Sequence, residues 1–391
     1  MRLIRMMAVV ALAAALPALP ADLSAQSSLF GVRGLGLPGR PTTPRVRGTG
    51  GSFALFDGES DFNPAAMANL KAVTAGFVIA PTWRTWETPA GSAHLRDTRF
   101  PLVFVGGPIP HSRLAIGVSF GSYADRDFRL ATRDSLVIRG VQTQVFDTLK
   151  SVGGLNEIRF AAGYQLGART SVGAAVYWIT GSSRLEARRA FSDTNYLPFR
   201  QSAELSYQGV GFSVGITHQI SRAIQLAALL RSDAHVTVDR DSSQVYKVDL
   251  PYTLSAGALI KVSPVLSVAA SGTYRTWGGA NSDLLAQGGV GAHNTVELSL
   301  GGELARNLRR PTKLPIRFGA RYADLPFPVV AGERPKEFSI SAGTGLRFAQ
   351  DRAGIDLSLE HAWRSEGTPY KERAFMLAFG LSIRPYGEQQ R

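Results

Sequence analysis

The sequence predicts an all-β protein: a transmembrane antiparallel β-barrel of about 14 strands, preceded by an N-terminal plug segment. Three observations support this fold class. Large apolar residues alternate with small ones over most of the chain, short and long connections alternate, and the chain begins with an export signal. Only 19% of the 391 residues are charged, which fits a wide apolar surface. Because the chain has no cysteine, disulfide scaffolds and thiolate metal sites are excluded.

Residues 1–25 have the features of a secretory signal peptide. Arg2 and Arg5 precede an apolar stretch from Ala8 to Leu16, and small residues ending at Ala25 provide a plausible cleavage site. The apolar stretch is too short to span a bilayer comfortably. We therefore expect export through a cleaved signal peptide and localisation in the bacterial outer membrane.

Residues 72–391 are predicted to form the barrel. In residues 114–121, 210–216 and 338–348, one face is branched or aromatic and the other is mainly glycine, serine or charged. A membrane barrel explains this pattern, because lipid contacts the large apolar face and the lumen contacts the small or polar face. Closure is required because lipid cannot satisfy an unpaired strand edge. A water-soluble sandwich or a solenoid is the alternative.

Strands are expected near 72–86, 94–107, 113–128, 145–166, 171–185, 203–220, 224–240, 244–262, 265–277, 293–305, 313–323, 336–349, 353–364 and 371–385. Long polar links are expected between some of them, including 124–145 and 181–202. In outer-membrane barrels, such long links are extracellular and the short ones are periplasmic.

Residues 26–71 lack sustained alternation and are rich in glycine, proline and small residues. Within them a short helix is predicted, with Asn63 as its N-cap and Pro64 at its first position. Two interpretations fit the segment: a disordered tail, or a plug folded into the lumen.

The motifs of this segment and of the last strands resemble one known family. Phe53-Ala54-Leu55-Phe56-Asp57, then Asn63-Pro64-Ala65, then a first strand at Val73 is similar to the long-chain fatty acid transporter family of outer-membrane proteins. Residues 315–322, 338–343 and 354–360 are similar to its final strands. Two departures are Ala66, where the family commonly has glycine, and the five residues after Tyr386, where many such barrels end in an aromatic residue.

The resemblance implies a hatch at residues 26–71 and hatch-gated passive diffusion of hydrophobic small molecules such as long-chain fatty acids. Asn63, Pro64 and Ala65 would then set the hatch conformation. Five apolar side chains are expected either to line a hydrophobic passage or to wedge the plug in place. These are Leu55, Phe56, Phe62, Met67 and Leu70.

Charged residues of the late strands are predicted to form a polar network in the lumen. Its members are Arg317, Arg321, Arg347, Asp356 and Glu360. By strand parity these side chains point away from the lipid, where a charge would cost about 2–4 kcal/mol at the midplane. They would either anchor the hatch or bind a substrate carboxylate, or they would pair with one another and fill the barrel.

No catalytic site, metal site or cofactor is predicted. Two Gly-x-Ser-x-Gly matches place Ser119 and Ser213 on continuous strands rather than on the strand-to-helix turn that a hydrolase needs. The six histidines have no metal-ligand spacing, and the net charge of +13 is scattered, which argues against nucleic acid. The expected partners are membrane lipids and lipopolysaccharide, a hydrophobic small-molecule ligand, and the barrel assembly machinery during biogenesis.

Two other functions are consistent with the same fold. One is a non-transporting outer-membrane barrel that serves protein secretion or surface attachment. Long structured outer loops and an occluded lumen without an apolar pocket would favour it. The other is a polar-solute porin, which predicts a continuous charged lumen and steady conductance.

Overall fold

The computed structural model describes residues 28–88, 91–240, 243–306, 313–367 and 370–385. The predicted signal peptide, Tyr386 and the residues that follow it lie outside the described part of the chain. Within the described part, no helix has the length and apolar character needed to cross a membrane.

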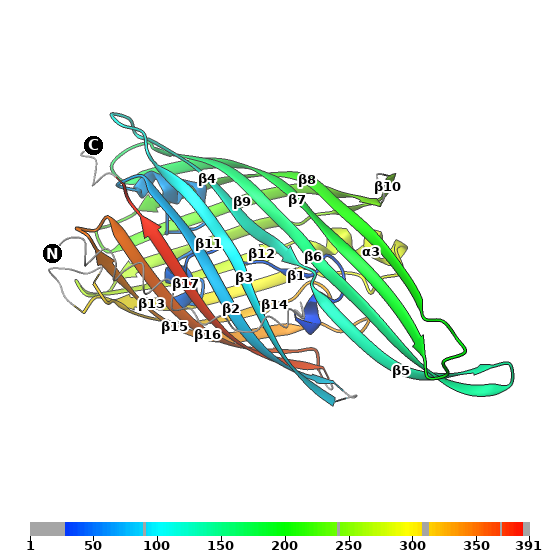
Figure 1. Ribbon diagram of the computed structural model, residues 1–391. Helices are drawn as coiled ribbons and strands as arrows, with labels where there is room; N and C mark the ends of the chain where they lie inside the picture. Colours follow the sequence, from blue (N-terminus) through cyan, green and yellow to red (C-terminus); the bar gives the residue numbers. More distant parts are fainter. Residues whose placement is uncertain (1–27, 89–90, 241–242, 307–312, 368–369, 386–391) are drawn as a thin grey trace, which may run out of the picture.

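The described strands form one closed antiparallel sheet, and fourteen of them make the barrel wall (Figure 1). The wall strands are β2 (Thr74–Thr88), β3 (Gly91–Pro108), β4 (Leu114–Asp125), β6 (Val141–Gln165), β7 (Thr170–Phe191), β8 (Phe199–Gln219), β9 (Ile224–Arg240), β11 (Tyr252–Lys261), β12 (Leu266–Arg275), β13 (Thr295–Leu304), β14 (Ile316–Asp324), β15 (Lys336–Phe348), β16 (Ala353–Ser365) and β17 (Lys371–Ile383). Pairing of β17 with β2 closes the barrel, so the predicted fold class is confirmed.

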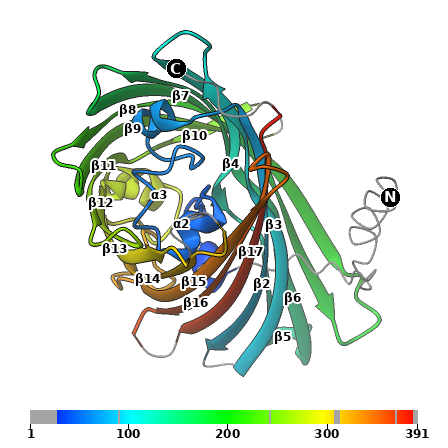
Figure 2. The same cartoon turned by 90° about the vertical axis from the view of Figure 1, so that its left-hand side faces the viewer.

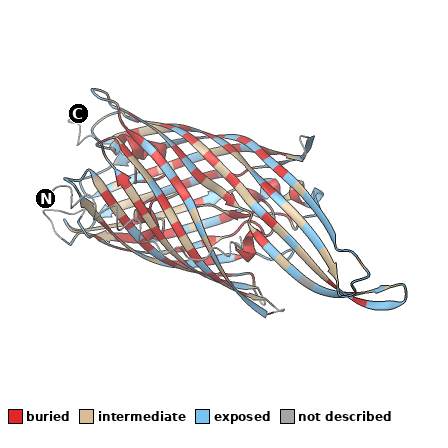
Figure 3. Cartoon of the chain, viewed as in Figure 1, coloured by how far each residue is buried: buried red, intermediate tan, exposed pale blue. Residues whose placement is uncertain are grey.

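Burial alternates along the wall strands, as the stripes in Figure 3 show. Val118, Phe212 and Leu300 are 46%, 58% and 57% exposed on the outer face. Ser119 and Ser213, the neighbours of the first two, are buried on the luminal face. The large apolar residues therefore form the outer surface, as expected for a wall that faces lipid.

Two hairpins are longer than the sequence predicts. The links expected at 124–145 and 181–202 are largely strand: β5 (Phe128–Ile138) pairs with β6, and β6 pairs with β7 as far as Phe191. A two-residue turn with positive φ at Arg139 and Gly140 joins β5 to β6, a geometry that matches strand twist. The strand expected at 244–262 is divided into β10 (Ser243–Asp249) and β11, and both pair with β9. The β5 to β8 hairpins extend past the rest of the wall at one end (Figure 1).

Residues 28–73 run through the inside of the barrel, where Figure 2 shows them as the blue chain within the ring of strands. We call these residues the luminal segment. Its elements are η1 (Leu29–Gly31), the two-residue strand β1 (Leu37–Pro38), α2 (Pro44–Gly48) and η2 (Pro64–Asn69). Two further short helices, η3 (Trp277–Ala280) and α3 (Asn281–Ala286), lie in the connection between β12 and β13.

Candidate functional site: the occupied barrel lumen

Two short helices anchor the luminal segment, and the local sequence explains both. Helix α2 begins after Thr43, whose hydroxyl accepts a hydrogen bond from the first turn, and Pro44 is its first residue. Helix η2 begins in the same way, because the Asn63 side chain accepts a hydrogen bond of 3.1 Å from the Ala65 amide and Pro64 comes first. Helices this short are not stable alone, so they depend on the wall that they contact.

The predicted hatch motif, residues 63–65, lies against a row of glycines on the wall. Gly163, Gly173 and Gly215 are cross-strand neighbours on β6, β7 and β8. A Cβ at Gly163 would lie 2.8 Å from the Pro64 carbonyl oxygen, and one at Gly173 or Gly215 would overlap atoms of the motif. Only glycine permits so close an approach. We call the contact of residues 61–70 with β4, β6, β7 and β8 the η2 dock.

Asp61 brings a buried charge to the η2 dock. Its Oδ1 accepts hydrogen bonds from Ser119 on β4 at 2.6 Å and from Arg159 on β6 at 2.9 Å. Burial raises the pKa of Asp61 above its ordinary value, and the Arg159 charge opposes this shift. Ser119, the centre of one Gly-x-Ser-x-Gly match, thus contacts the luminal segment from within a regular strand.

The contact of residues 40–51 with β13 to β17 is rich in ion pairs, and we call it the α2 dock. Glu303 accepts hydrogen bonds from both Arg45, at 2.9 and 3.0 Å, and Arg317, at 2.7 Å. Asp356 accepts bonds of 2.6 Å from Arg317 and from Arg347. The Glu303 charge raises the pKa of Arg45 above its ordinary range. Helix α2 is therefore joined to a chain of alternating charges on four wall strands, β13 to β16.

The α2 dock also contains a close backbone approach. Gly301 and Gly319 are cross-strand neighbours, and a Cβ on either would overlap the carbonyl group of Thr49. Arg40 of the same segment pairs with Glu360 on β16 at 2.5 Å. Each dock therefore combines a glycine surface with charged contacts, but the α2 dock holds more of the charges.

A belt of alternating charges continues around the lumen. In strand order from β12 to β17 it consists of Arg275, Glu297, Arg321, Glu337, Arg364 and Glu372. Glu297 lies 3.0 Å from both of its arginine neighbours. Glu372 also accepts a hydrogen bond of 2.7 Å from the Ser28 hydroxyl, so the belt holds the start of the luminal segment. Buried charges that alternate in sign compensate one another, whereas an unpaired one would be costly.

All five residues of the predicted lumen network are buried or partly buried on the luminal side. Arg317, Arg347 and Asp356 meet in one cluster, Arg321 belongs to the belt, and Glu360 pairs with Arg40 of the luminal segment. The structure does not bring the five into one site. Their role in anchoring a hatch or binding a ligand stays a prediction.

The predicted passage residues divide into two groups. Leu55, Phe56 and Phe62 pack together against β9, whereas Met67 and Leu70 pack against alanines of β4, β6 and β7. Of the two roles predicted for them, wedging the plug against the wall accords with this packing. A hydrophobic passage along them stays a prediction.

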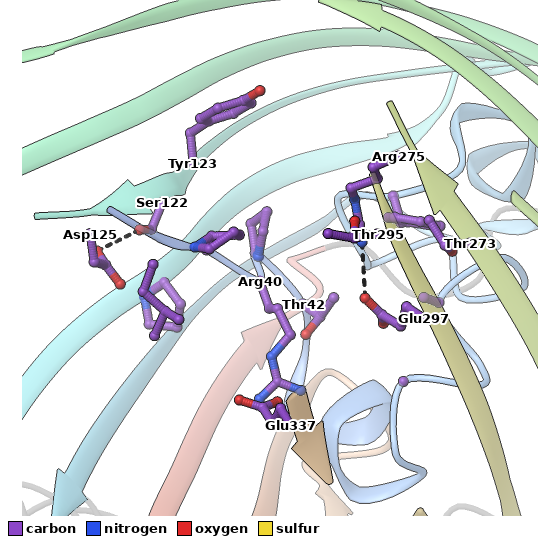
Figure 4. A pocket seen from close by; sticks show the side chains of 18 of the residues that line it. Arg40, Thr42, Ser122, Tyr123, Asp125, Thr273, Arg275, Thr295, Glu297 and Glu337 are labelled. Carbon is purple, nitrogen blue, oxygen red and sulfur yellow. Dashed lines mark hydrogen bonds and ion pairs between the residues drawn. The ribbon is translucent and has the colours of Figure 1, made fainter. Parts of the chain in front are cut away.

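A cavity of about 180 Å³ lies between the luminal segment and the wall. Figure 4 shows Arg40 of the segment facing Glu337, with the linked pairs Arg275–Glu297 and Ser122–Asp125 around the same space. Apolar residues share the lining, among them Ala54, Phe62, Ala80, Pro101, Leu229 and Met376. The cavity thus offers both apolar surface and many hydrogen-bonding groups.

Several residues of these contacts are absent from the predicted site. Arg45, Asp61 and Arg159 join the luminal segment to the wall, and Glu337 and Arg364 lie in the belt. Strand parity alone could have placed Arg159 and Glu337 on the luminal face. Nothing in the spacing of the sequence indicates which of them meets the luminal segment.

Fold and lumen together define a membrane-spanning β-barrel whose N-terminal segment occupies the lumen. The family model described as BamG matches residues 3–239 of the 391-residue chain. The chain therefore belongs to the BamG family. No curated protein sequence matches it.

Several solved structures have a similar fold. A Pseudomonas aeruginosa FadL homologue has 12% identity and a TM-score of 0.63, over 90% of this chain and 100% of the other. The Ralstonia pickettii toluene transporter TbuX has 14% identity and a TM-score of 0.56, over 89% and 99%. The P. putida toluene transporter TodX has 15% identity and a TM-score of 0.56, also over 89% and 99%. At these identities the likeness concerns the fold.

Proposed function

We propose that the protein is an outer-membrane channel for hydrophobic small molecules, with long-chain fatty acids and single-ring hydrocarbons as the candidate substrates. Passage is by passive diffusion, and residues 26–71 form a hatch that controls it. Residues 1–25 are the signal peptide that directs the chain to the outer membrane. The partners are membrane lipids, lipopolysaccharide and, during biogenesis, the barrel assembly machinery.

One observation carries this proposal: the luminal segment fills the barrel through two separate docks and leaves a cavity between itself and the wall. A segment held by two docks can release one and keep the other, which is the property a gate needs. A ligand would open the route only if it prefers the released arrangement. Two of the proteins with this fold are named toluene transporters, and a third is named a FadL homologue.

Uptake by liposomes that contain the purified barrel tests the proposal. Labelled toluene and a labelled long-chain fatty acid are supplied outside, and their accumulation inside is compared with that of empty liposomes. Transport predicts a faster, saturable uptake of at least one of the two. Rates equal to those of empty liposomes for both would overturn the proposal.

Two observations favour a second candidate, a non-transporting barrel for protein secretion or surface attachment. The β5 to β8 hairpins are long and paired throughout, and the cavity lining is heavily charged. This function predicts that shortening the β5–β6 hairpin abolishes the display of a partner protein while solute uptake stays at the control level. A polar-solute porin has less support, because the luminal segment occupies the space that such a pore keeps open.

A further inference from the structure

The cavity beside α2 is bordered by an arginine without an acidic partner. Arg47 is 5% exposed and lines the cavity, and no carboxylate of the described residues lies within 4.0 Å of its guanidinium group. Its Nη2 donates to the Arg40 carbonyl oxygen at 2.6 Å and its Nη1 to the Met376 sulfur at 2.9 Å. Its Nε has no hydrogen-bond partner. Every other luminal arginine described above has a carboxylate partner, and Arg47 differs from them because it has none within 4.0 Å among the described residues.

Other donors around the cavity are also unsatisfied. Arg84 is 5% exposed, its Nε and Nη1 have no hydrogen-bond partner, and its acidic neighbours Asp97 and Glu372 lie at 3.6 and 3.7 Å. The indole nitrogen of Trp277 lacks a hydrogen-bond partner as well. Among the buried cavity-lining atoms without partners in the described chain, Asp61 Oδ2 is the one acceptor, and all the others are donors. Such a lining suits a molecule rich in acceptors.

The electrostatics of Arg47 point to an anion. Burial, together with the charge of Arg40, lowers the pKa of Arg47 to about 10. The buried cation is therefore under-compensated, and a bound anion would compensate it. A guanidinium group forms two parallel hydrogen bonds with a carboxylate, which is planar and presents two oxygens at the matching spacing.

The size of the cavity and its apolar lining define the rest of the ligand. Its volume is about 180 Å³, close to the roughly 150 Å³ of an apolar cavity that binds benzene. Ala80 and Met376 belong to one apolar cluster, and the Met376 sulfur contacts Arg47; Pro101 adds apolar surface to the same lining. A single ring fits this space, whereas a long acyl chain exceeds it.

We infer that the luminal cavity is a binding site for single-ring organic carboxylates, with the carboxylate on Arg47 and the ring against Ala80 and Met376. This inference rests on the proposed channel function, because it names the class of solute that pauses beside the hatch. A carboxylate site of this kind would distinguish this lumen from one that carries only neutral hydrocarbons.

Calorimetric titration of the full-length barrel in detergent with benzoate tests the site, with toluene as the neutral ring of similar size. Wild type is expected to bind benzoate saturably, and Arg47→Gln to bind it at least tenfold more weakly while its affinity for toluene is unchanged. Arg47→Lys keeps the charge but lacks the planar fork, so its affinity should fall between the two. The matched control is Arg33→Gln, which changes an exposed arginine of the same segment outside the cavity lining and should bind like wild type.

Heat-modifiable migration on gels shows whether each variant is folded before titration. Benzoate binding that is absent in wild type, or equal in wild type and Arg47→Gln, overturns the inference. The liposome assay separates this outcome from failure of the proposed function. Uptake of toluene without any binding of benzoate would support the proposed channel function and overturn the proposed carboxylate site. Binding of benzoate without uptake of any solute would support the site and overturn the channel function.

Discussion

The η2 dock and the α2 dock hold the same segment to opposite parts of the wall, but by different balances of forces. The η2 dock places residues 63–65 on the glycine row Gly163, Gly173 and Gly215, with Asp61–Arg159 as its buried ion pair. The α2 dock also uses glycines, yet Arg45, Arg40 and their partners add a branched network of charges. The η2 dock thus depends mainly on shape, and the α2 dock on shape and charge together.

This difference shows how one dock of the luminal segment can open while the other stays closed. Close backbone packing is insensitive to salt and fails steeply when an atom is added, whereas partly exposed ion pairs weaken gradually with salt and with loss of one charge. Because the chain has no cysteine, a single Cys at a buried position of either dock reports its opening without background labelling. Ala66→Cys reports the η2 dock and Val46→Cys the α2 dock, since both residues are fully buried.

Removing both docks at once should give the largest effect. Deletion of residues 28–71 takes away all but the last two residues of the luminal segment and leaves a barrel lined by arginine and carboxylate groups. We expect a steady polar conductance in planar bilayers where the intact chain conducts rarely. Equal conductance of the two proteins would mean that the segment does not gate the lumen.

Adding one methyl group at the η2 dock should give the next largest effect. A Cβ at Gly173 would collide with the backbone of Pro64 and Ala65, which cannot move aside as a flexible side chain can. Overpacking of this kind costs roughly 1–3 kcal/mol. Gly173→Ala should therefore speed maleimide labelling at Ala66→Cys by about tenfold or more and leave labelling at Val46→Cys unchanged.

The control for that substitution is Gly272→Ala. Gly272 is also a wall glycine, but a Cβ there would meet its nearest neighbour, a Leu298 side-chain atom, at 3.5 Å. Labelling at both reporters should match that of the parent. If Gly173→Ala accelerated both reporters equally, the docks would open together and the comparison between them would fail.

The sequence predicts the wall well because strand alternation is a local signal. The alternation around Ser119 and Ser213 correctly places large side chains outside and small ones inside, and the Asn63-Pro64 start correctly predicts a short helix. The sequence predicts a long polar link over residues 124–145, which contain Arg133, Asp134 and Ser135. There the cross-strand pairing with β6 decides the structure.

The docks could not be predicted from the sequence, because their contacts join residues that are far apart in the chain. Arg45 and Glu303 lie far apart in sequence, and parity says only that each faces the lumen. The alternation in residues 210–216 predicts Gly215 on the small luminal face, but not its neighbours Gly163 and Gly173. That the three form one row under Pro64 depends on the register of three strands. Contacts of this kind depend on closure of the whole barrel.

Loss of a charge should have a smaller effect, confined to the α2 dock. Glu303→Gln leaves Arg45 and the buried Arg317 without this carboxylate. Breaking a fully buried pair costs about 3–5 kcal/mol, but Arg45 and Glu303 are 35% and 21% exposed, so we expect about 1–2 kcal/mol. Labelling at Val46→Cys should rise about five- to thirtyfold at low salt, and labelling at Ala66→Cys should not change.

Two measurements check the cause of that change. Raising the salt concentration should bring the parent closer to Glu303→Gln, because screening weakens the same ion pairs. Glu204→Gln is the matched control, since its pair with Arg184 is 50% and 70% exposed and lies outside the dock. An identical rise in that variant would show that the labelling reports total charge rather than the α2 dock.

The smallest effect should come from a change of pH. Acid is expected to strengthen docking of the luminal segment, whereas acid denaturation weakens a folded structure. Burial raises the pKa of both Asp61 and Glu59 in the docked segment. A carboxyl group whose pKa is raised in the docked state binds protons more readily in that state than in the released state. Docking is therefore strongest at low pH and weakens as the pH rises through the raised pKa. Between pH 7 and about pH 5, above the ordinary carboxyl pKa of about 4, acidification should therefore lower the open probability in planar bilayers several-fold. Asp61→Asn combined with Glu59→Gln should flatten this dependence, and an undiminished pH response in the double variant would assign it to groups outside the luminal segment.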